Sequence, residues 1–193
     1  MEGPLVIAFG AASRFFAEAV GLVPASAWRQ GGLGHWTLVE LVAHGNRAHT
    51  TLQDYLLRPR PPEPPGSSYF SDEAVAERGR VAVAALGTDP AAAVGAASER
   101  AIALVERTPA NATVGSPAGT MTLGAYLPSR IAELTIHGLD VAAAVGPGLA
   151  APPLALVESL RFVTGRLVKK GEGQAVLLAL AGRAALPPGL SAY

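Results

Sequence analysis

The sequence predicts an all-α protein whose core is a four-helix bundle. Half of its 193 residues are hydrophobic but only 6% are aromatic, and alanine, valine and leucine dominate the hydrophobic set. Alanine-rich surfaces suit close helix packing better than a sheet, where β-branched and aromatic residues are favoured. Apolar residues also recur at helical spacing in long segments that proline and glycine separate. This length is enough for one core, so we expect residues 1–193 to form a single domain.

Two long helices are expected at the start of the chain. The first spans residues 5–22 and is followed by a loop. The second has the strongest start signal in the sequence, because Thr37-Leu-Val-Glu40 is a capping box whose side chains satisfy backbone N–H groups of the first turn. Its apolar face carries His44 toward the core, whereas His49 is rotated off that face and is expected at the surface.

Proline and glycine divide the middle of the chain. A stiff loop is expected over residues 58–68, because five prolines there exclude a helix. A helix capped by serine is expected over 71–87. Another, with proline at its first position, is expected over 90–108. Residues 111–119 are expected to form a loop.

The last part of the chain predicts two further helices and a tail. One helix covers 122–145, and Pro128 either kinks it or marks its true start. Another covers 153–170. A short C-terminal extension, 171–193, contains an apolar stretch, 174–186, that fits either strand or helix. The helices expected to form the four-helix core are 5–22, 37–55, 122–145 and 153–170.

Charge and composition exclude several classes of function. Basic and acidic residues number 15 each without a basic run, so the chain lacks the phosphate neutralisation on which nucleic-acid binding depends. No membrane association is expected, because no apolar run reaches the ~18 residues of a span and no polybasic patch occurs. The first ten residues lack the basic segment of a signal peptide. There is no cysteine, which excludes thiolate ligands and a cysteine nucleophile and is compatible with the expected cytoplasmic location.

Three residues on two of these helices form a candidate metal site. Glu133 and His137 are four residues apart and share one face of their helix, and His44 points inward from another helix. Two imidazoles and one carboxylate are enough to bind a divalent transition metal with an open coordination position. The alternative is a buried pair of Glu133 with His137 or with Arg130, because a carboxylate on an apolar face is costly unless it is paired.

Two further side chains can contribute to chemistry at this site. Arg130 can bind a substrate carboxylate bidentately, or it can pair with Glu133, which is slightly favoured. Asp140, three residues after His137, can hydrogen-bond an imidazole ligand and so support a metal, or it can lie at the surface.

Three segments resemble motifs of the mycothiol-dependent maleylpyruvate isomerase-like proteins, a branch of the DinB-like metal-binding helical bundles. Gly34-His-Trp-Thr-Leu-Val-Glu-Leu-Val-Ala-His44 is similar to a Trp-Thr-x-x-Asp/Glu-Leu-x-x-His signature. Arg130-Ile-Ala-Glu-Leu-Thr-Ile-His-Gly-Leu-Asp140 is similar to an Arg-x-x-Glu-x-x-x-His-Gly-x-Asp block. Residues 177–190 are similar to a Leu-Thr-Gly-Arg-x-x-Leu-Pro-x-Gly ending. The motifs occur in family order and extend over most of the chain.

The resemblance implies a DinB-like four-helix core that holds a divalent metal, usually zinc. At the matching positions the ligands are His44, Glu133 and His137. It also implies a low-molecular-weight thiol cosubstrate, mycothiol, that attacks an electrophile in cis–trans isomerisation, conjugation or a related transfer. A metal-coordinated thiol is deprotonated at neutral pH, and the thiolate is the competent nucleophile.

We therefore expect a metal-dependent isomerase or transferase that acts on a small molecule together with a thiol. Two other functions stay open: a metal- or ligand-binding bundle without catalytic activity, and a metal-dependent hydrolase that uses bound water. The sequence does not name the substrate or decide between zinc, nickel and iron. A homodimer through exposed helix faces is compatible with the sequence but is not fixed by it.

Overall fold

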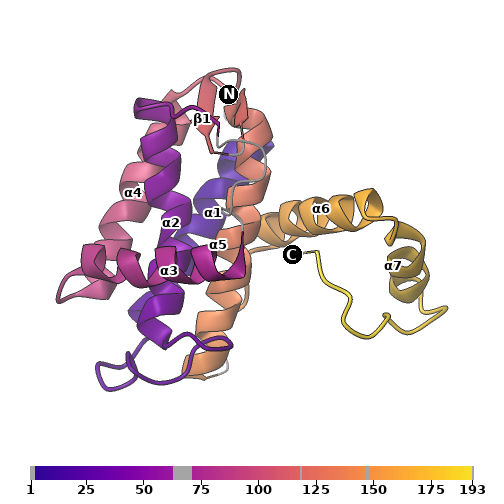
Figure 1. The fold of residues 1–193 in the computed structure, drawn as a ribbon, viewed down its shortest axis with the longest axis horizontal. Helices are drawn as coiled ribbons and strands as arrows, with labels where there is room; N and C mark the ends of the chain where they lie inside the picture. Colours follow the sequence, from indigo (N-terminus) through magenta and orange to yellow (C-terminus); the bar gives the residue numbers. More distant parts are fainter. Residues whose placement is uncertain (1–2, 63–70, 118, 147, 193) are drawn as a thin grey trace.

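The computed structural model describes residues 3–62, 71–117, 119–146 and 148–192, and over these residues it confirms the all-α prediction (Figure 1). The α-helices of the described part are α1 (Pro4–Gly21), α2 (Leu38–Leu57), α3 (Asp72–Val83), α4 (Pro90–Arg107), α5 (Leu123–Val145), α6 (Pro153–Lys169) and α7 (Gly173–Leu180). A 3₁₀ helix, Ala84–Leu86, follows α3. An antiparallel hairpin of β1 (Thr113–Ser116) and β2 (Gly119–Thr122) precedes α5.

Four helices form the core, but one of them is not the helix that was expected. α1 packs against α4 and α5, and α2 packs against the same two helices (Figure 1). The prediction that residues 153–170 supply the fourth core helix is therefore wrong, because α4 takes this place. Burial explains the difference: α4 buries seven residues, among them Val94, Ala101 and Val105, whereas α6 buries only three.

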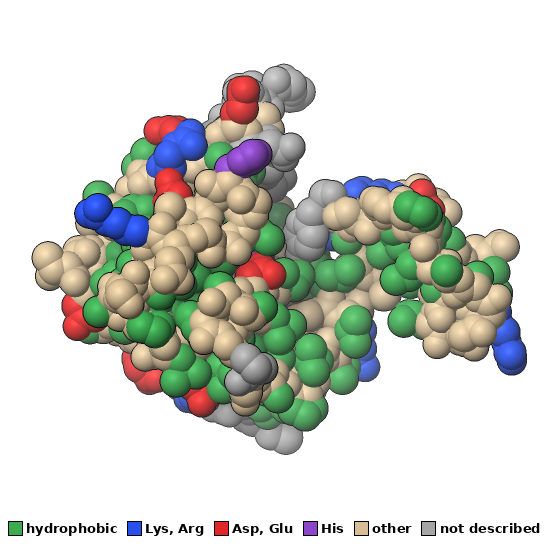
Figure 2. All heavy atoms as spheres, turned by 90° about the horizontal axis from the view of Figure 1, so that it is seen from below, with side chains coloured by type: hydrophobic (Ala, Val, Ile, Leu, Met, Phe, Trp, Pro, Cys, Tyr) green, Lys and Arg blue, Asp and Glu red, His purple; other side chains and the backbone are tan. Residues whose placement is uncertain are grey.

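Residues 153–192, which we call the arm, project from the bundle (Figure 1). The arm begins against α5 and α1, where Ala155 is buried in the main core. Farther out it has a small hydrophobic cluster of its own around Leu167, Val176 and Ala192. Figure 2 shows hydrophobic side chains over the outer surface of the arm. Its most exposed large hydrophobic residues include Leu160, Val168, Leu177 and Leu180.

Side chains form hydrogen bonds at the starts of four helices, as predicted for α2 and α3. The capping box before α2 is present, and the backbone N–H of Thr37 donates to Glu40 Oε2 at 2.8 Å. Pro128 lies inside α5 and does not mark its start. The side chains that accept from the first turns of α3, α4 and α5 are those of Ser71, Asp89 and Thr122.

Three connecting segments complete the comparison with the sequence. The predicted loop 111–119 contains β1, whose strand was missed because four residues are too few for a periodic signal. The apolar stretch 174–186 continues α7 at first and is irregular afterwards, so it contains no strand. Of the predicted loop 58–68, residues 58–62 are non-helical, and the rest lies outside the described residues.

The prediction that His49 lies at the surface is wrong. Its side chain is 0% exposed, and its ring centroid lies 6.5 Å from that of Phe9 and 6.0 Å from that of Phe16. α2 contacts α3 and α4 as well as α5, so its buried surface extends well beyond the single apolar face read from the sequence.

Helix α1 is long and apolar enough to cross a membrane, by length and composition alone. The sequence expectation concerned unbroken apolar runs, and Arg14 and Glu18 interrupt the apolar residues of this helix. Half of α1 is buried inside the protein, and Phe9 and Phe16 lie in the main core. Packing against α4 and α5 therefore accounts for the apolar character of this helix.

Candidate metal centre

Helices α2 and α5 bring the three predicted metal ligands together. His44 comes from α2, and Glu133 and His137 lie one turn apart on α5. The two helices approach closely because residue 45 is glycine. A Cβ at Gly45 would lie 2.7 Å from the ring of Phe16 and 3.2 Å from the Cβ of His137.

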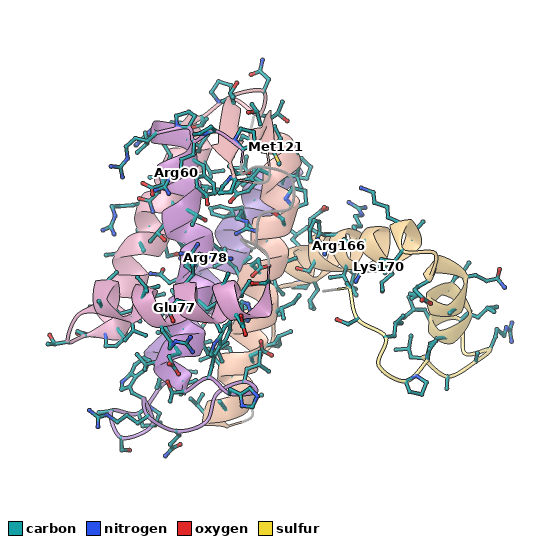
Figure 3. The ribbon with its side chains drawn as sticks, viewed as in Figure 1. Arg60, Glu77, Arg78, Met121, Arg166 and Lys170 are labelled. Atoms are coloured by element: carbon teal, nitrogen blue, oxygen red, sulfur yellow. The ribbon has the colours of Figure 1, made fainter. Side chains whose placement is uncertain are left out.

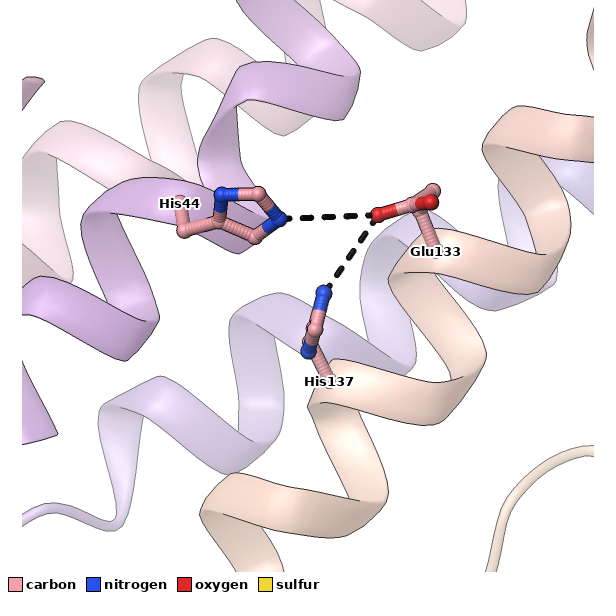
Figure 4. Close-up of side chains that lie close together, drawn as sticks. All are labelled: His44, Glu133 and His137. Carbon is pink, nitrogen blue, oxygen red and sulfur yellow. Dashed lines mark ion pairs between the residues drawn. The ribbon is translucent and has the colours of Figure 1, made fainter. Parts of the chain in front are cut away.

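The three side chains converge on one carboxylate oxygen (Figure 4). Glu133 Oε2 lies 3.3 Å from His137 Nε2 and 3.8 Å from His44 Nε2. One ligand atom from each residue lies within 4.8 Å of the other two. The side chains are 16% exposed for His44, 23% for Glu133 and 12% for His137. The cluster is therefore largely buried but still open to solvent.

Neighbouring side chains hold both imidazoles in place. The Nδ1–H of His137 donates to Asp140 Oδ2 at 3.0 Å, which directs Nε2 toward Glu133. The ring of Trp36 lies against that of His44, with centroids 4.5 Å apart. In the described part of the protein, the buried Nδ1 of His44 has no hydrogen-bond partner. The contact of Trp36 with His44 was missed from the sequence, whose only hint was the position of Trp36 beside the capping box.

The three groups influence one another's protonation. Burial alone would raise the pKa of Glu133, but hydrogen bonds with His137 and His44 outweigh it and lower this pKa. Burial opposes charge on His137, yet hydrogen bonds to Asp140 and Glu133 raise its pKa to about 9. The pKa of His44 is lowered, mainly by burial. A metal ion that binds here has to displace the proton of His137.

The donor set fits a divalent transition metal. Zinc binds imidazole nitrogen and carboxylate oxygen at about 2.0–2.1 Å, so two ligand atoms of one tetrahedral ion lie about 3.3 Å apart. The separations of 3.3 and 3.8 Å at Glu133 Oε2 are close to this value. A hydrogen bond such as that between His137 and Asp140 is the usual support of a metal-bound histidine.

Arg130 lies near the cluster but, within the described residues, forms no ion pair with Glu133, which was the slightly favoured alternative. Its guanidinium carbon lies 4.9 Å from the ring centroid of Tyr126, and its Nε donates to Ser129 Oγ at 3.2 Å. Its charge adds to the histidine hydrogen bonds that, against the effect of burial, lower the pKa of Glu133.

Comparison with protein-family models shows to which family this chain belongs. The model of the mycothiol maleylpyruvate isomerase N-terminal domain matches residues 9–142, which is more than half of the sequence. The chain belongs to this family. The part of this chain that matches the mycothiol maleylpyruvate isomerase N-terminal domain includes His44, Glu133 and His137 and ends before the arm. Neither the curated proteins nor the solved structures gave a match.

Proposed function

We propose that this protein binds a divalent metal, most simply zinc, through His44, Glu133 and His137, and activates a low-molecular-weight thiol. The thiol would attack a small electrophilic substrate, and the reaction would either isomerise this substrate or leave the thiol attached to it. The convergence of two imidazoles and one carboxylate inside the family domain carries this proposal. The bound metal would supply the charge that deprotonates a coordinated thiol. Because the chain has no cysteine, the thiol has to come from a cosubstrate, and the family name points to mycothiol.

In this proposal the surrounding residues position the ligands. Asp140 accepts the Nδ1–H of His137 and keeps Nε2 directed at the metal. Trp36 packs on His44 and covers that side of the ring against water. Arg130 adds positive charge beside Glu133, where an acidic substrate would be attracted. A cytoplasmic location suits a cysteine-free chain that depends on a soluble thiol.

Metal content, measured by plasma mass spectrometry on untagged protein, is the first test. About one metal ion per chain is expected, and both His44→Ala and Glu133→Ala/His137→Ala should lose it. His35→Ala is the matched control, because His35 is an exposed histidine outside the cluster and its variant should keep the metal. Absence of metal from the wild type, even after incubation with zinc and dialysis, would contradict the proposal and leave Glu133 and His137 as a buried polar pair.

Turnover then separates the thiol-dependent activity from its two alternatives. Metal-loaded protein should convert a small electrophile only when mycothiol or another low-molecular-weight thiol is added. Ester hydrolysis without added thiol would instead favour the hydrolase. Intact metal together with no turnover in any thiol or ester assay would favour a bundle that binds without catalysis.

A further inference from the structure

The two imidazoles of the metal centre are held by different kinds of contact. The Nδ1–H of His137 donates to Asp140, which is the usual support of a metal-bound histidine. The Nδ1 of His44 is also buried, but none of the residues that the structure describes forms a hydrogen bond with it. His44 Nε2 lies 3.8 Å from Glu133 Oε2, compared with 3.3 Å for His137 Nε2. Hydrogen bonding among the described residues therefore orients His137 more firmly than His44.

Aromatic contacts hold the His44 ring instead. The ring of Trp36 lies against one face of this imidazole, with centroids 4.5 Å apart and planes inclined by 38°. The ring of His137 meets it nearly at a right angle, with centroids 5.0 Å apart. Aromatic pairs at these separations are attractive. A rotation of the His44 side chain away from Glu133 would break both contacts.

The backbone at Trp36 is fixed at the start of α2. Its N–H donates to Leu33 O at 2.9 Å, and its carbonyl oxygen accepts from the N–H of Gly32 at 2.8 Å. The turn between these residues contains Gly34 at φ +58°, a conformation that favours glycine. The next residue, Thr37, is the N-cap of α2. Trp36 therefore cannot shift its backbone without disturbing the capped end of the helix that carries His44.

Helix α3 covers the stacked pair of Trp36 and His44 from outside. Figure 3 shows α3 across α2, with Glu77 and Arg78 labelled on it. The next residue, Gly79, is buried, and a Cβ there would lie 3.6 Å from Trp36 Cζ2 and 3.7 Å from His44 Cβ. The backbone of α3 thus packs on both members of the pair and limits their movement.

We propose that Trp36 is a positioning residue, which holds the imidazole of His44 directed at the metal centre in place of the hydrogen bond that orients His137. The orientation of the ring concerns the protein alone, whereas its consequence for zinc rests on the proposed function. Removing an outer partner of a metal-bound histidine typically weakens metal binding by about 10–100-fold. Position 36 therefore requires a flat ring, because another apolar side chain excludes water but offers no face for the imidazole.

The test compares three variants of the full-length protein. Zinc affinity is measured by competition with a chelator, and ring orientation by nuclear Overhauser effects between the His44 and His137 rings in metal-free protein. Trp36→Leu should bind zinc at least about tenfold more weakly and lose the contact between the two rings. Trp36→Phe should keep the contact and stay within about threefold of the wild-type affinity. Trp28→Leu is the matched control, because Trp28 is the other tryptophan and is also partly buried against the main core.

The outcomes separate the role of Trp36 from the presence of a metal. The role is overturned if Trp36→Leu keeps both the ring contact and the zinc affinity, if Trp36→Phe loses as much as Trp36→Leu, or if Trp28→Leu weakens zinc binding equally. Wild-type protein without an Overhauser effect between the Trp36 and His44 rings would overturn it without any variant. Expected ring contacts in a protein that takes up no zinc would support the orientation by Trp36 and overturn only the proposed function. Backbone amide spectra show whether each variant remains folded.

Discussion

His49 is a neutral histidine at the contact between α1 and α2. Phe9 and Phe16 of α1 flank its ring, and its Nδ1–H donates to Asn46 Oδ1 at 3.0 Å. Nε2 is buried and has no hydrogen-bond partner in the described residues. Burial lowers the pKa of His49 to about 3. The folded protein therefore keeps this ring neutral at pH values where the unfolded chain would protonate it.

This difference predicts a loss of stability in acid that can be assigned to His49. Below pH ~6.5 the unfolded chain binds a proton at this residue and the folded protein does not. As the pH decreases, the free energy of unfolding therefore falls by up to about 1.4 kcal/mol per pH unit, until the pH reaches the pKa of His49 in the folded protein. His49→Asn keeps a donor near the Nδ1 position and should flatten the slope measured by urea unfolding between about pH 4.5 and 6.5. His35→Asn, at an exposed position, should keep the wild-type slope. Equal slopes for wild type and His49→Asn would contradict the assignment.

At the residue scale, the spacing of residues along a helix predicted which side chains lie together, but it did not predict which side chains are buried. Glu133 and His137 were grouped correctly because a four-residue spacing fixes two side chains on one face in any α-helix. The surface prediction for His49 failed because it assumed one buried face, and α2 is enclosed by α3, α4 and α5 while its His49 ring meets α1. No pattern in the sequence shows how many neighbours a helix has.

Gly45 and Gly79 both lie near the metal centre, but only Gly79 has space for a methyl group. Alanine substitutions at these two positions therefore test what sets the helix spacing. Gly45→Ala places a methyl 2.7 Å from the buried ring of Phe16, so α1 or α5 has to shift. We expect a loss of about 1–3 kcal/mol in the free energy of unfolding, measured in urea. Gly79→Ala is the matched control, because its methyl would meet Trp36 at an ordinary 3.6 Å. That variant should be neutral or more stable by up to about 1 kcal/mol.

The same pair of variants reports on the metal centre. A Cβ at Gly45 would also lie 3.2 Å from the Cβ of His137, so the substitution changes the separation of α2 from α5. Gly45→Ala should therefore weaken zinc binding in a competition titration with a chelator, and Gly79→Ala should not. Equal stability and equal zinc affinity in the two variants would show that the close approach at Gly45 is not what sets the helix spacing.

At the element scale, the starts of helices were predictable from the sequence, but the helices against which each one packs were not. Thr37, Ser71 and Asp89 act locally on the first turn that follows them, so a few residues of sequence contain the whole signal. The choice of α4 over residues 153–170 for the core depends on contacts between distant segments. Both segments have an apolar face at helical spacing, and periodicity alone does not rank them.

The whole molecule consists of two parts with very different amounts of core. The bundle encloses one large cluster that α1, α2, α4 and α5 share. The outer arm has only Leu167, Val176 and Ala192 buried in its own cluster, and backbone oxygens of its last residues accept from the side chains of Arg166 and Lys170. The family match ends at residue 142, so the conserved domain model describes the bundle and not the arm. Stability should follow the same division.

We expect the arm to open without the bundle. Local unfolding is favoured where few apolar contacts are buried, so backbone amides of residues 163–180 should exchange with deuterium at least about 100-fold faster than those in the middle of α5. Hydrogen-exchange mass spectrometry measures both segments in one sample. Leu167→Ala should accelerate exchange in the arm further and leave α1 and α5 unchanged, because Leu167 belongs to the outer cluster and not to the main core. Uniform protection across arm and bundle, or an effect of Leu167→Ala that reaches α5, would mean that the protein unfolds as one unit and that the arm is held by contacts beyond its own small core.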